Sequence, residues 1–216
     1  MDAPHWKTSI SQALSQSSGT ANRVLQLSSL DASDPSRPFI RSLFFHSFVS
    51  AAAHPSRTVL VAPVDMRTPK LAHLLAHPSV RLSWQLPDAG EQCLMSGTVA
   101  ILPTPEDTLY PHYAFAIRRP EPNSGLQALA DEAFDWDKLR EDVYQSLDLR
   151  HQQSFKSRRP AGSSPCGDDT SNPNGVPEAE EHVADVEILE MKEWPTTRRT
   201  RFWRSREGIW ASEQVV

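Results

Sequence analysis

The order of helix-like and strand-like runs most constrains what this chain of 216 residues can fold into. Trp6, Ile10 and Leu14 recur every four residues and predict an amphipathic helix over 6–16. Runs rich in β-branched and aromatic residues follow, and turn-forming residues separate them. The predicted strands are 23–30, 39–49, 57–64, 80–86, 91–102, 183–191, 196–206 and 210–216, with hairpin turns at 31–38 and 87–90. A short helix from 69 to Pro78 and a longer one over 131–155 lie between strands. This order predicts a mainly β, antiparallel barrel with flanking helices.

The composition predicts a single domain over residues 1–216. A hydrophobic fraction of 38% with six tryptophans is enough for a substantial core. Residues 158–182 differ from the rest, because they include one large aliphatic residue and no aromatic residue. Such a stretch cannot bury enough apolar surface to offset its ordering entropy, so we predict a disordered insertion there.

Charge and missing motifs argue against several classes of function. A net charge of −5 is not expected to attract nucleic acid or anionic membranes in general. No apolar stretch reaches the roughly 18 residues of a membrane span. The N-terminus lacks the pattern of a secretory signal, so a cytoplasmic location is expected. The glycine-loop motifs of nucleotide-binding proteins and the GxSxG motif of hydrolases are absent.

A metal site is also not expected. The two cysteines have neither a disulfide framework nor a zinc-site spacing. His73 and His77 lie four residues apart on the predicted short helix, but no third ligand accompanies them. Both histidines are therefore predicted to lie on a solvated helix face.

The segment 65–70 has the features of a phosphate-binding helix start. Thr68 has an oxygen suited to capping a helix, and Pro69 suits the first helical position. Unpaired amides at a helix start favour an anion, and Arg67 and Lys70 add positive charge beside them. The alternative is an ordinary capped helix at the surface.

Arg41 and Gln92 are further candidates for a binding site. In a strand, Arg41 shares a face with Phe39 and Leu43, and a guanidinium among apolar groups needs an anion. That anion is either a carboxylate of the chain or a phosphate. Gln92 follows a turn and has the donor and acceptor needed to contact the edge of a heterocycle, unless it is a solvated residue at a strand end.

The C-terminal run 197–206 contains five arginines interleaved with aromatic residues. Such a run also suits single-stranded nucleic acid, but in an acidic chain this is a minor reading, and no nucleic-acid partner is expected. The residues offer no catalytic triad, and catalytic residues stay unassigned.

Together these segments resemble the FMN-binding split-barrel family of pyridoxamine 5′-phosphate oxidase, and most closely its Alr4036-type branch. The resemblance covers nearly the whole chain. It rests on Ala3–Trp6, Arg41–Leu43, the Asp65-x-Arg67-Thr68-x-Lys70 segment, Glu91-Gln92 leading to Gly97, and Arg199–Phe202.

The resemblance implies FMN held at the interface of a homodimer. Arg41, Ser42 and Leu43 would border the cofactor, and Arg41, Thr68 and Lys70 would contact its phosphate and ribityl chain. The other subunit would add Gln92, and Arg201 would approach the flavin ring. Arg67 replaces a small residue of the oxidases, but is usual in this branch. His46 stands where the oxidases have a lysine.

Two departures bear on the substrate. The vitamin-phosphate site of the oxidases has no clear counterpart in 110–119, and their C-terminal Arg-x-His becomes Thr197-Arg198-Arg199. The resemblance therefore implies an FMN-dependent oxidoreductase of unknown substrate that is not an efficient pyridoxamine phosphate oxidase. The alternative is a flavin-binding carrier or sensor without turnover.

Overall fold

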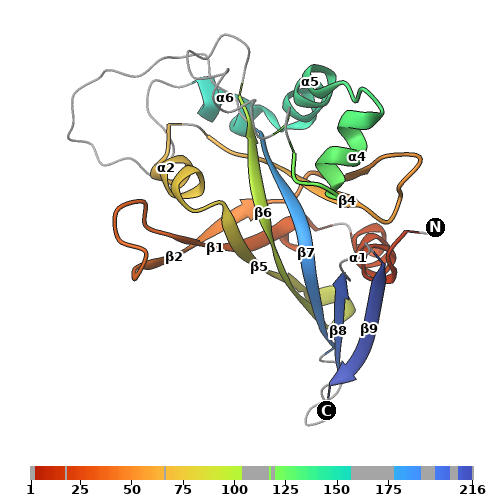
Figure 1. Ribbon diagram of the computed structural model, residues 1–216. Coiled ribbons are helices and arrows are strands. Elements are labelled where there is room, and N and C mark those ends of the chain that lie inside the picture. Colours follow the sequence, from red (N-terminus) through yellow and green to blue (C-terminus); the bar gives the residue numbers. More distant parts are fainter. Residues whose placement is uncertain are drawn as a thin grey trace.

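The protein is an antiparallel sheet of nine strands closed into a split barrel, with helices around it (Figure 1). The computed structural model describes residues 3–17, 19–65, 67–103, 117, 120–156, 178–190, 198–204 and 209–215. The strands are β1 (Val24–Leu30), β2 (Pro38–Phe44), β3 (Ser47–Ser50), β4 (Thr58–Pro63), β5 (Ser79–Leu86), β6 (Glu91–Leu102), β7 (Glu178–Glu190), β8 (Arg198–Arg204) and β9 (Trp210–Val215). The predicted mainly β barrel is confirmed.

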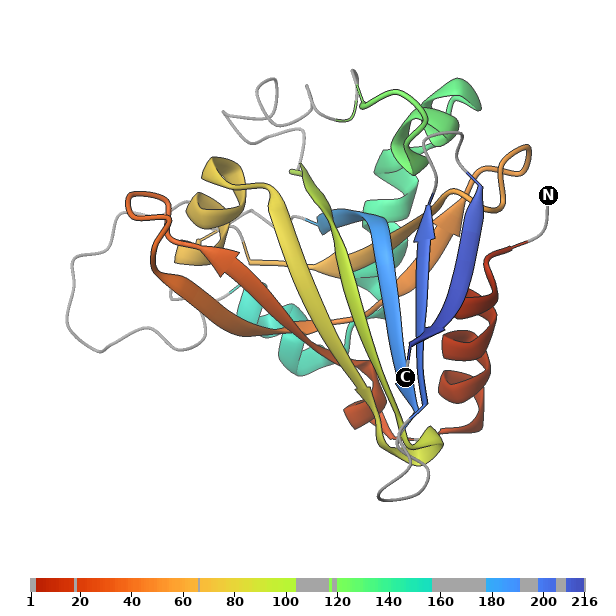
Figure 2. The same ribbon diagram turned by 60° about the horizontal axis from the view of Figure 1, so that its bottom comes forward.

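The sheet forks at β7. Its order is β2-β1-β5-β6-β7-β4-β3, and β8 also pairs with β7 and carries β9. Residues 178–182 of β7 pair with β4, whereas 185–190 pair with β8. β6 pairs along the other edge of β7, with a register shift between Ser96 and Gly97. In Figure 2, the strands of this forked sheet converge near the β5–β6 turn and fan apart at the opposite end.

The predicted strand 39–49 is wrong in one respect, since it is two strands. β2 pairs with β1, and β3 pairs with β4. At the corner between them, the Phe45 amide donates to Arg23 O at 2.7 Å and the His46 amide donates to Val61 O at 2.9 Å. The chain thus changes its hydrogen-bond partner from one side of the barrel to the other within two residues. This corner closes the barrel.

The inward faces of the strands form the core. Leu25, Leu27 and Trp84 are fully buried, in step with the period of two along β1 and β5. Trp84 Nε1 donates to Asn22 O at 2.7 Å, so the indole has no lost hydrogen bond. Helix α1 (His5–Gln16) buries Trp6 and Ile10 against this core, as its spacing predicted.

The predicted helix over 131–155 is wrong in one respect, because it is not continuous. α4 (Gly125–Asp131) ends at its first residue, and α5 (Trp136–Ser146) and α6 (Leu149–Lys156) occupy most of the rest. Asp135 caps α5 by accepting from the Lys138 amide at 2.9 Å. Asp148 accepts from the His151 amide at 2.8 Å and in this way caps the start of α6.

The other helices whose bounds the structure describes are α2 (Pro69–Ala76) and the 3₁₀ turns η1 (Thr20–Arg23) and η2 (Pro87–Ala89). None of the described helices is both long and apolar enough to cross a membrane. The predicted insertion 158–182 needs correction at its end, because 178–182 form part of β7 and pair with β4 and β6. Its other residues lie outside the described part of the chain.

Candidate anion and cofactor site

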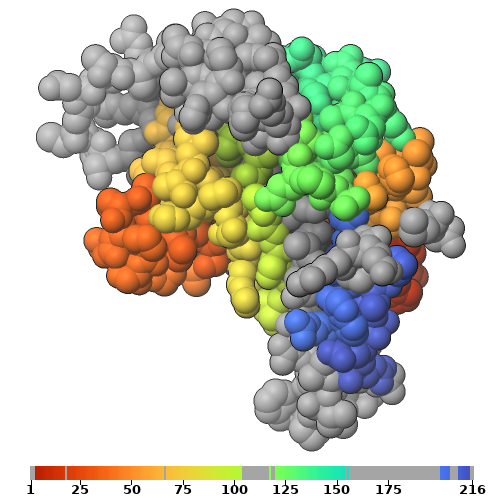
Figure 3. Space-filling view, in the orientation of Figure 1, coloured from red at the N-terminus to blue at the C-terminus, as the bar shows by residue number. Residues whose placement is uncertain are grey.

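Strand β2 and helix α2 bring several of the predicted residues together. Arg41 Nη2 lies 3.2 Å from His73 Nδ1, and Lys70 Nζ donates to Ser42 O at 3.3 Å. Lys70 and His73 are three residues apart and therefore lie on the same face of α2. In Figure 3, α2 (yellow) and the β1–β2 hairpin (orange-red) lie against each other, away from β8 and β9 (blue).

Arg41 has an unsatisfied donor. Its guanidinium packs 5.0 Å from the centre of the Phe39 ring, and burial lowers the pKa of Arg41. Nη1 is buried and has no hydrogen-bond partner among the described residues. Within the same residues, no carboxylate forms an ion pair with Arg41. A buried charged donor without an acceptor is costly, so the site suits an anion such as a phosphate monoester.

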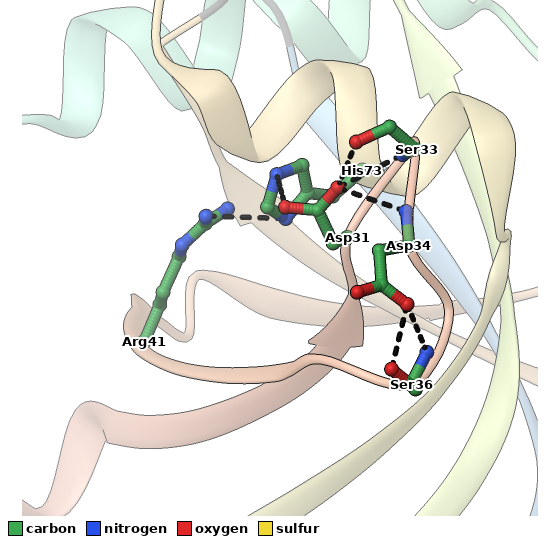
Figure 4. A network of polar contacts seen from close by, with 6 residues as sticks. All are labelled: Asp31, Ser33, Asp34, Ser36, Arg41 and His73. Carbon is green, nitrogen blue, oxygen red and sulfur yellow. Dashed lines mark hydrogen bonds and ion pairs between the residues drawn. The ribbon is translucent and has the colours of Figure 1, made fainter.

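His73 is buried, so its predicted solvated position is wrong. Only 7% of its surface is exposed, and its Nε2 lies 3.9 Å from Asp31 Oδ2 (Figure 4). Asp31 begins a tight turn, in which its Oδ1 accepts from the Ser33 amide, the Ser33 hydroxyl and the Asp34 amide. These hydrogen bonds lower the pKa of Asp31 to about 2, the Ser33 hydroxyl first among them. The carboxylate that faces His73 is therefore ionised.

Arg67 is paired inside its own loop. Its Nε and Nη2 donate to the two oxygens of Asp65 at 2.9 and 2.7 Å, and its amide donates to Asp65 Oδ1 at 3.0 Å. The Asp65 hydrogen bond raises the pKa of Arg67. Its role as a cofactor ligand stays a prediction, and its charge is balanced by Asp65.

Thr68 occupies the N-cap position of α2, as predicted, but its side chain does not cap the helix. Its hydroxyl instead donates to Asp65 O at 2.8 Å. The hydroxyl thus helps to fold the loop before α2. Pro69 is the first helical residue, as its fixed φ favours.

Gln92 and Ser42 lie on the outer face of the sheet. Gln92 Nε2 donates to Ser83 Oγ at 2.9 Å, and Gln26 Nε2 donates to Ser42 Oγ at 3.3 Å. Ser83, Gln26 and Ser42 stand in one cross-strand row, so these amides and hydroxyls form a polar band. Arg41 points to the opposite, inner face, because neighbouring residues of a strand alternate. The Leu43 side chain also points inward and is 2% exposed, which leaves only its backbone for a ligand.

Arg201 does not join Arg41 within one chain. It lies on β8, and four strands stand between β8 and β2 in the sheet. Arg201 Nη1 lies 4.0 Å from Glu213 Oε1 on β9, and both side chains are half exposed. The predicted site residues thus form a β2–α2 group, an outer-face group with Gln92, and Arg201 apart from both.

His46 has a role that the sequence did not indicate. Its two ring nitrogens lie 2.9 Å from Ser47 Oγ and Ser146 Oγ, which links the β2–β3 corner to α5. Burial lowers the pKa of His46, Arg23 lowers it further, and Asp142 opposes them. This imidazole is therefore neutral in the folded protein, and its two contacts connect the β2–β3 corner to α5.

A cavity of about 520 Å³ lies away from β2 and α2, between α1 and the β8–β9 hairpin. His5 stacks on Phe202 at its edge, with ring centres 5.9 Å apart. Glu91 and Glu213 also line it, so its charge does not suit a phosphate. Among the described residues, no cluster of three or more His, Cys, Asp or Glu side chains is arranged to hold a metal ion.

Asp31 and His73 are the residues of this region that sequence reasoning missed. The signal for Asp31 was its place in Asp31-Ala32-Ser33-Asp34, where an aspartate two residues before a serine favours an Asx turn. For His73 the signal was its spacing of three from Lys70. The predicted substrate segment 110–119 lies outside the described residues except for Ile117, which is buried.

Residues 3–103 match the family model described as the pyridoxamine 5′-phosphate oxidase FMN-binding domain. Comparison with curated protein sequences gave no match. Among solved structures, the chain is similar to a pyridoxamine 5′-phosphate oxidase-related, FMN binding protein from Nostoc punctiforme, with 22% identity over 99% of this chain and 97% of that chain and a TM-score of 0.69.

The chain is also similar to PhzG from Burkholderia lata, whose structure contains tetrahydrophenazine-1-carboxylic acid. That match has 16% identity, covers 97% of this chain and 89% of that chain, and has a TM-score of 0.52. At such identities the structural matches establish the fold. Residues 3–103, which include β2, α2 and all of β6, thus match the FMN-binding domain of the pyridoxamine 5′-phosphate oxidases, and the chain shares the fold of two solved structures.

Proposed function

We propose that the protein binds FMN through the β2–α2 group and is an FMN-dependent oxidoreductase of the Alr4036-type branch. The observation that carries the proposal is the buried Nη1 of Arg41, which lacks an acceptor in the described part of the chain. The match of 3–103 to an FMN-binding domain supports FMN phosphate as that anion.

Each member of the group has a defined task in this proposal. Arg41 Nη1 donates to a phosphate oxygen, and the Lys70 ammonium, next to the Ser42 carbonyl, adds a second cation. The first amide groups of α2, at the positive end of the helix dipole, face the same anion. Ser42 and Thr68 border the ribityl chain, and Arg67 borders the cofactor from the loop before α2. The flavin ring would accept and donate electrons, while the protein supplies position and charge.

A homodimer with the cofactor at its interface completes the proposal. Gln92 lies on the outer face of the sheet and Arg41 on the inner face, so one chain does not bring them to one ligand. A second copy would bring its Gln92 to the FMN of the first. Arg201 would approach the ring in the same assembly.

The first measurement is the visible spectrum of the purified protein, followed by reconstitution with FMN. Arg41→Ala with Lys70→Ala should abolish or strongly weaken retention, because each lost charge-assisted hydrogen bond costs about 1.5–3 kcal/mol. The matched control is Lys138→Ala with Arg150→Ala, which removes two exposed cations from α5 and α6. Full retention of FMN by the first variant argues against this site, and failure of the wild type to bind FMN argues against the function.

The reaction class needs a second measurement. Reduction of bound FMN by NADH or NADPH, followed by reoxidation, would support an oxidoreductase. Failure of every tested reductant would favour a carrier or sensor instead. We expect no efficient turnover of pyridoxamine 5′-phosphate, because Thr197-Arg198-Arg199 replaces the Arg-x-His of the oxidases. Turnover at an ordinary enzymic rate would contradict this.

A further inference from the structure

A chain of polar contacts holds the Arg41 side chain in place. It runs from Arg41 on β2, through His73 on α2, to Asp31 in the turn that joins β1 to β2 (Figure 4). The two outer members belong to one hairpin, and the middle one belongs to the helix that packs on it. The orientation of the guanidinium therefore depends on how α2 sits on the β1–β2 hairpin.

The contacts define the protonation of His73. An arginine side chain is always protonated and can only donate hydrogen bonds. His73 Nδ1, at 3.2 Å from Arg41 Nη2, must therefore be the acceptor and carry a lone pair. The ring proton then lies on Nε2, which faces the ionised Asp31 carboxylate at 3.9 Å. Asp31 favours this tautomer electrostatically, and three hydrogen bonds fix its position.

The imidazole is also fixed by packing. His73 is 7% exposed, and its ring centre lies 4.8 Å from that of Phe39. The Arg41 guanidinium also packs on Phe39, 5.0 Å from the ring centre. Phe39 thus contacts both partners of the hydrogen bond, and neither partner moves without repacking the ring.

We propose that His73, oriented by Asp31, is a positioning residue that holds Nη2 of Arg41 and so presents Nη1 to the phosphate. The inference rests on the proposed FMN site and adds to it a residue that orients the phosphate ligand Arg41. In this proposal, the buried His73 contributes to FMN binding through Arg41 and need not touch the cofactor.

The test compares FMN with riboflavin, which has the same ring and no phosphate. His73→Phe keeps an aromatic ring beside Phe39 but removes the acceptor. It should weaken FMN binding on the order of tenfold and leave riboflavin binding unchanged. His73→Asn places a carboxamide oxygen near the position of Nδ1 and should restore most of the FMN affinity. His77→Phe, at the C-cap that follows α2, is the matched control and should change neither affinity.

Equal losses of FMN and riboflavin affinity in His73→Phe would mean a merely structural role and would overturn the inference. In that case the wild type still binds FMN, and the proposed function stands. A wild type that binds neither flavin refutes the proposed function itself.

Discussion

Arg41 and Arg67 both lie next to α2, and their partners differ. Arg67 makes a bidentate pair with Asp65, two residues before it, and so balances its own charge locally. Arg41 lies on the inner face of β2 and bonds a neutral imidazole instead of a carboxylate. A neutral acceptor satisfies one nitrogen, and the Asp31 carboxylate acts on the positive charge only from a distance. At the residue scale, this difference makes Arg41 the better candidate for an anion ligand.

His46 should make the stability of the protein depend on pH. Because burial lowers its folded-state pKa, the unfolded chain binds a proton more readily than the folded one. The free energy of unfolding should thus be highest above the usual histidine pKa of about 6.5 and fall as acid is added below it. His46→Gln keeps a donor for Ser146 but does not titrate, so its urea midpoint should fall less steeply on acidification. Parallel profiles of the two proteins would contradict this.

The sequence predicted the strand face of Arg41 correctly and the exposure of His73 wrongly, for a physical reason. A period of two follows directly from strand geometry, so the inward face of Arg41 was predictable. The leucines at 71, 74 and 75 indicated which face of α2 would be buried, yet Leu75 is 41% exposed and His73 is 7% exposed. Arg41 and Asp31 compensate the cost of burying the imidazole, and both come from another part of the chain.

At the scale of elements, the packing of α4 on β4 depends on a glycine. A Cβ on Gly125 would lie 2.7 Å from Val59 Cγ2 and 3.2 Å from Arg57 O. We expect Gly125→Ala to lower the free energy of unfolding by about 1–3 kcal/mol, as overpacking does. Gly19→Ala is the control, since its Cβ would meet nothing closer than 3.8 Å. Equal urea midpoints for the two variants would show that the α4 contact is not tight.

Ala133 is strained in the turn between α4 and α5. Its φ is 52°, in the left-handed region that glycine adopts without steric cost. Ala133→Gly should therefore raise the free energy of unfolding by up to about 1 kcal/mol. Ala130→Gly within α4 should lower it by a similar amount, about 0.5–1 kcal/mol, because there the alanine favours the helix. Calorimetry of both variants checks the opposite signs, and destabilisation by Ala133→Gly would contradict the strain.

The same turn explains why the predicted helix 131–155 is not continuous. Trp136, Leu139 and Val143 do recur at helical spacing, and alanine at 133 favours a helix, so nothing in the local pattern marks a break. The break comes from tertiary structure. Glu132 leaves the helix and accepts from the amides of Ala52 and Ala53 at 2.9 and 2.7 Å. These amides are far away in the sequence, and only the folded chain brings them to Glu132.

At the scale of the whole molecule, the two faces of the sheet divide the proposed site. Arg41 and Lys70 gather where β2 meets α2, and Gln92 belongs to the polar band on the outer face. Ile40, also on the outer side of β2, is 73% exposed. A single exposed aliphatic residue is normal on a protein surface, so the proposed dimer rests on the division of the site between the two faces. The sequence alone led to this dimer only through the family resemblance.

A mixing experiment tests whether two chains share one site. Arg41→Ala removes the phosphate ligand, and Gln92→Glu removes the amide donors and adds a negative charge, so each homodimer should bind FMN poorly. In a mixed dimer, one site has both substitutions, and the other combines the native Arg41 of one chain with the native Gln92 of the other. Co-refolding the two variants should therefore restore FMN to about half of the sites within the mixed dimers, measured by flavin absorbance after gel filtration. If both residues served one site within the same chain, every site in the mixture would have one substitution and no binding would return.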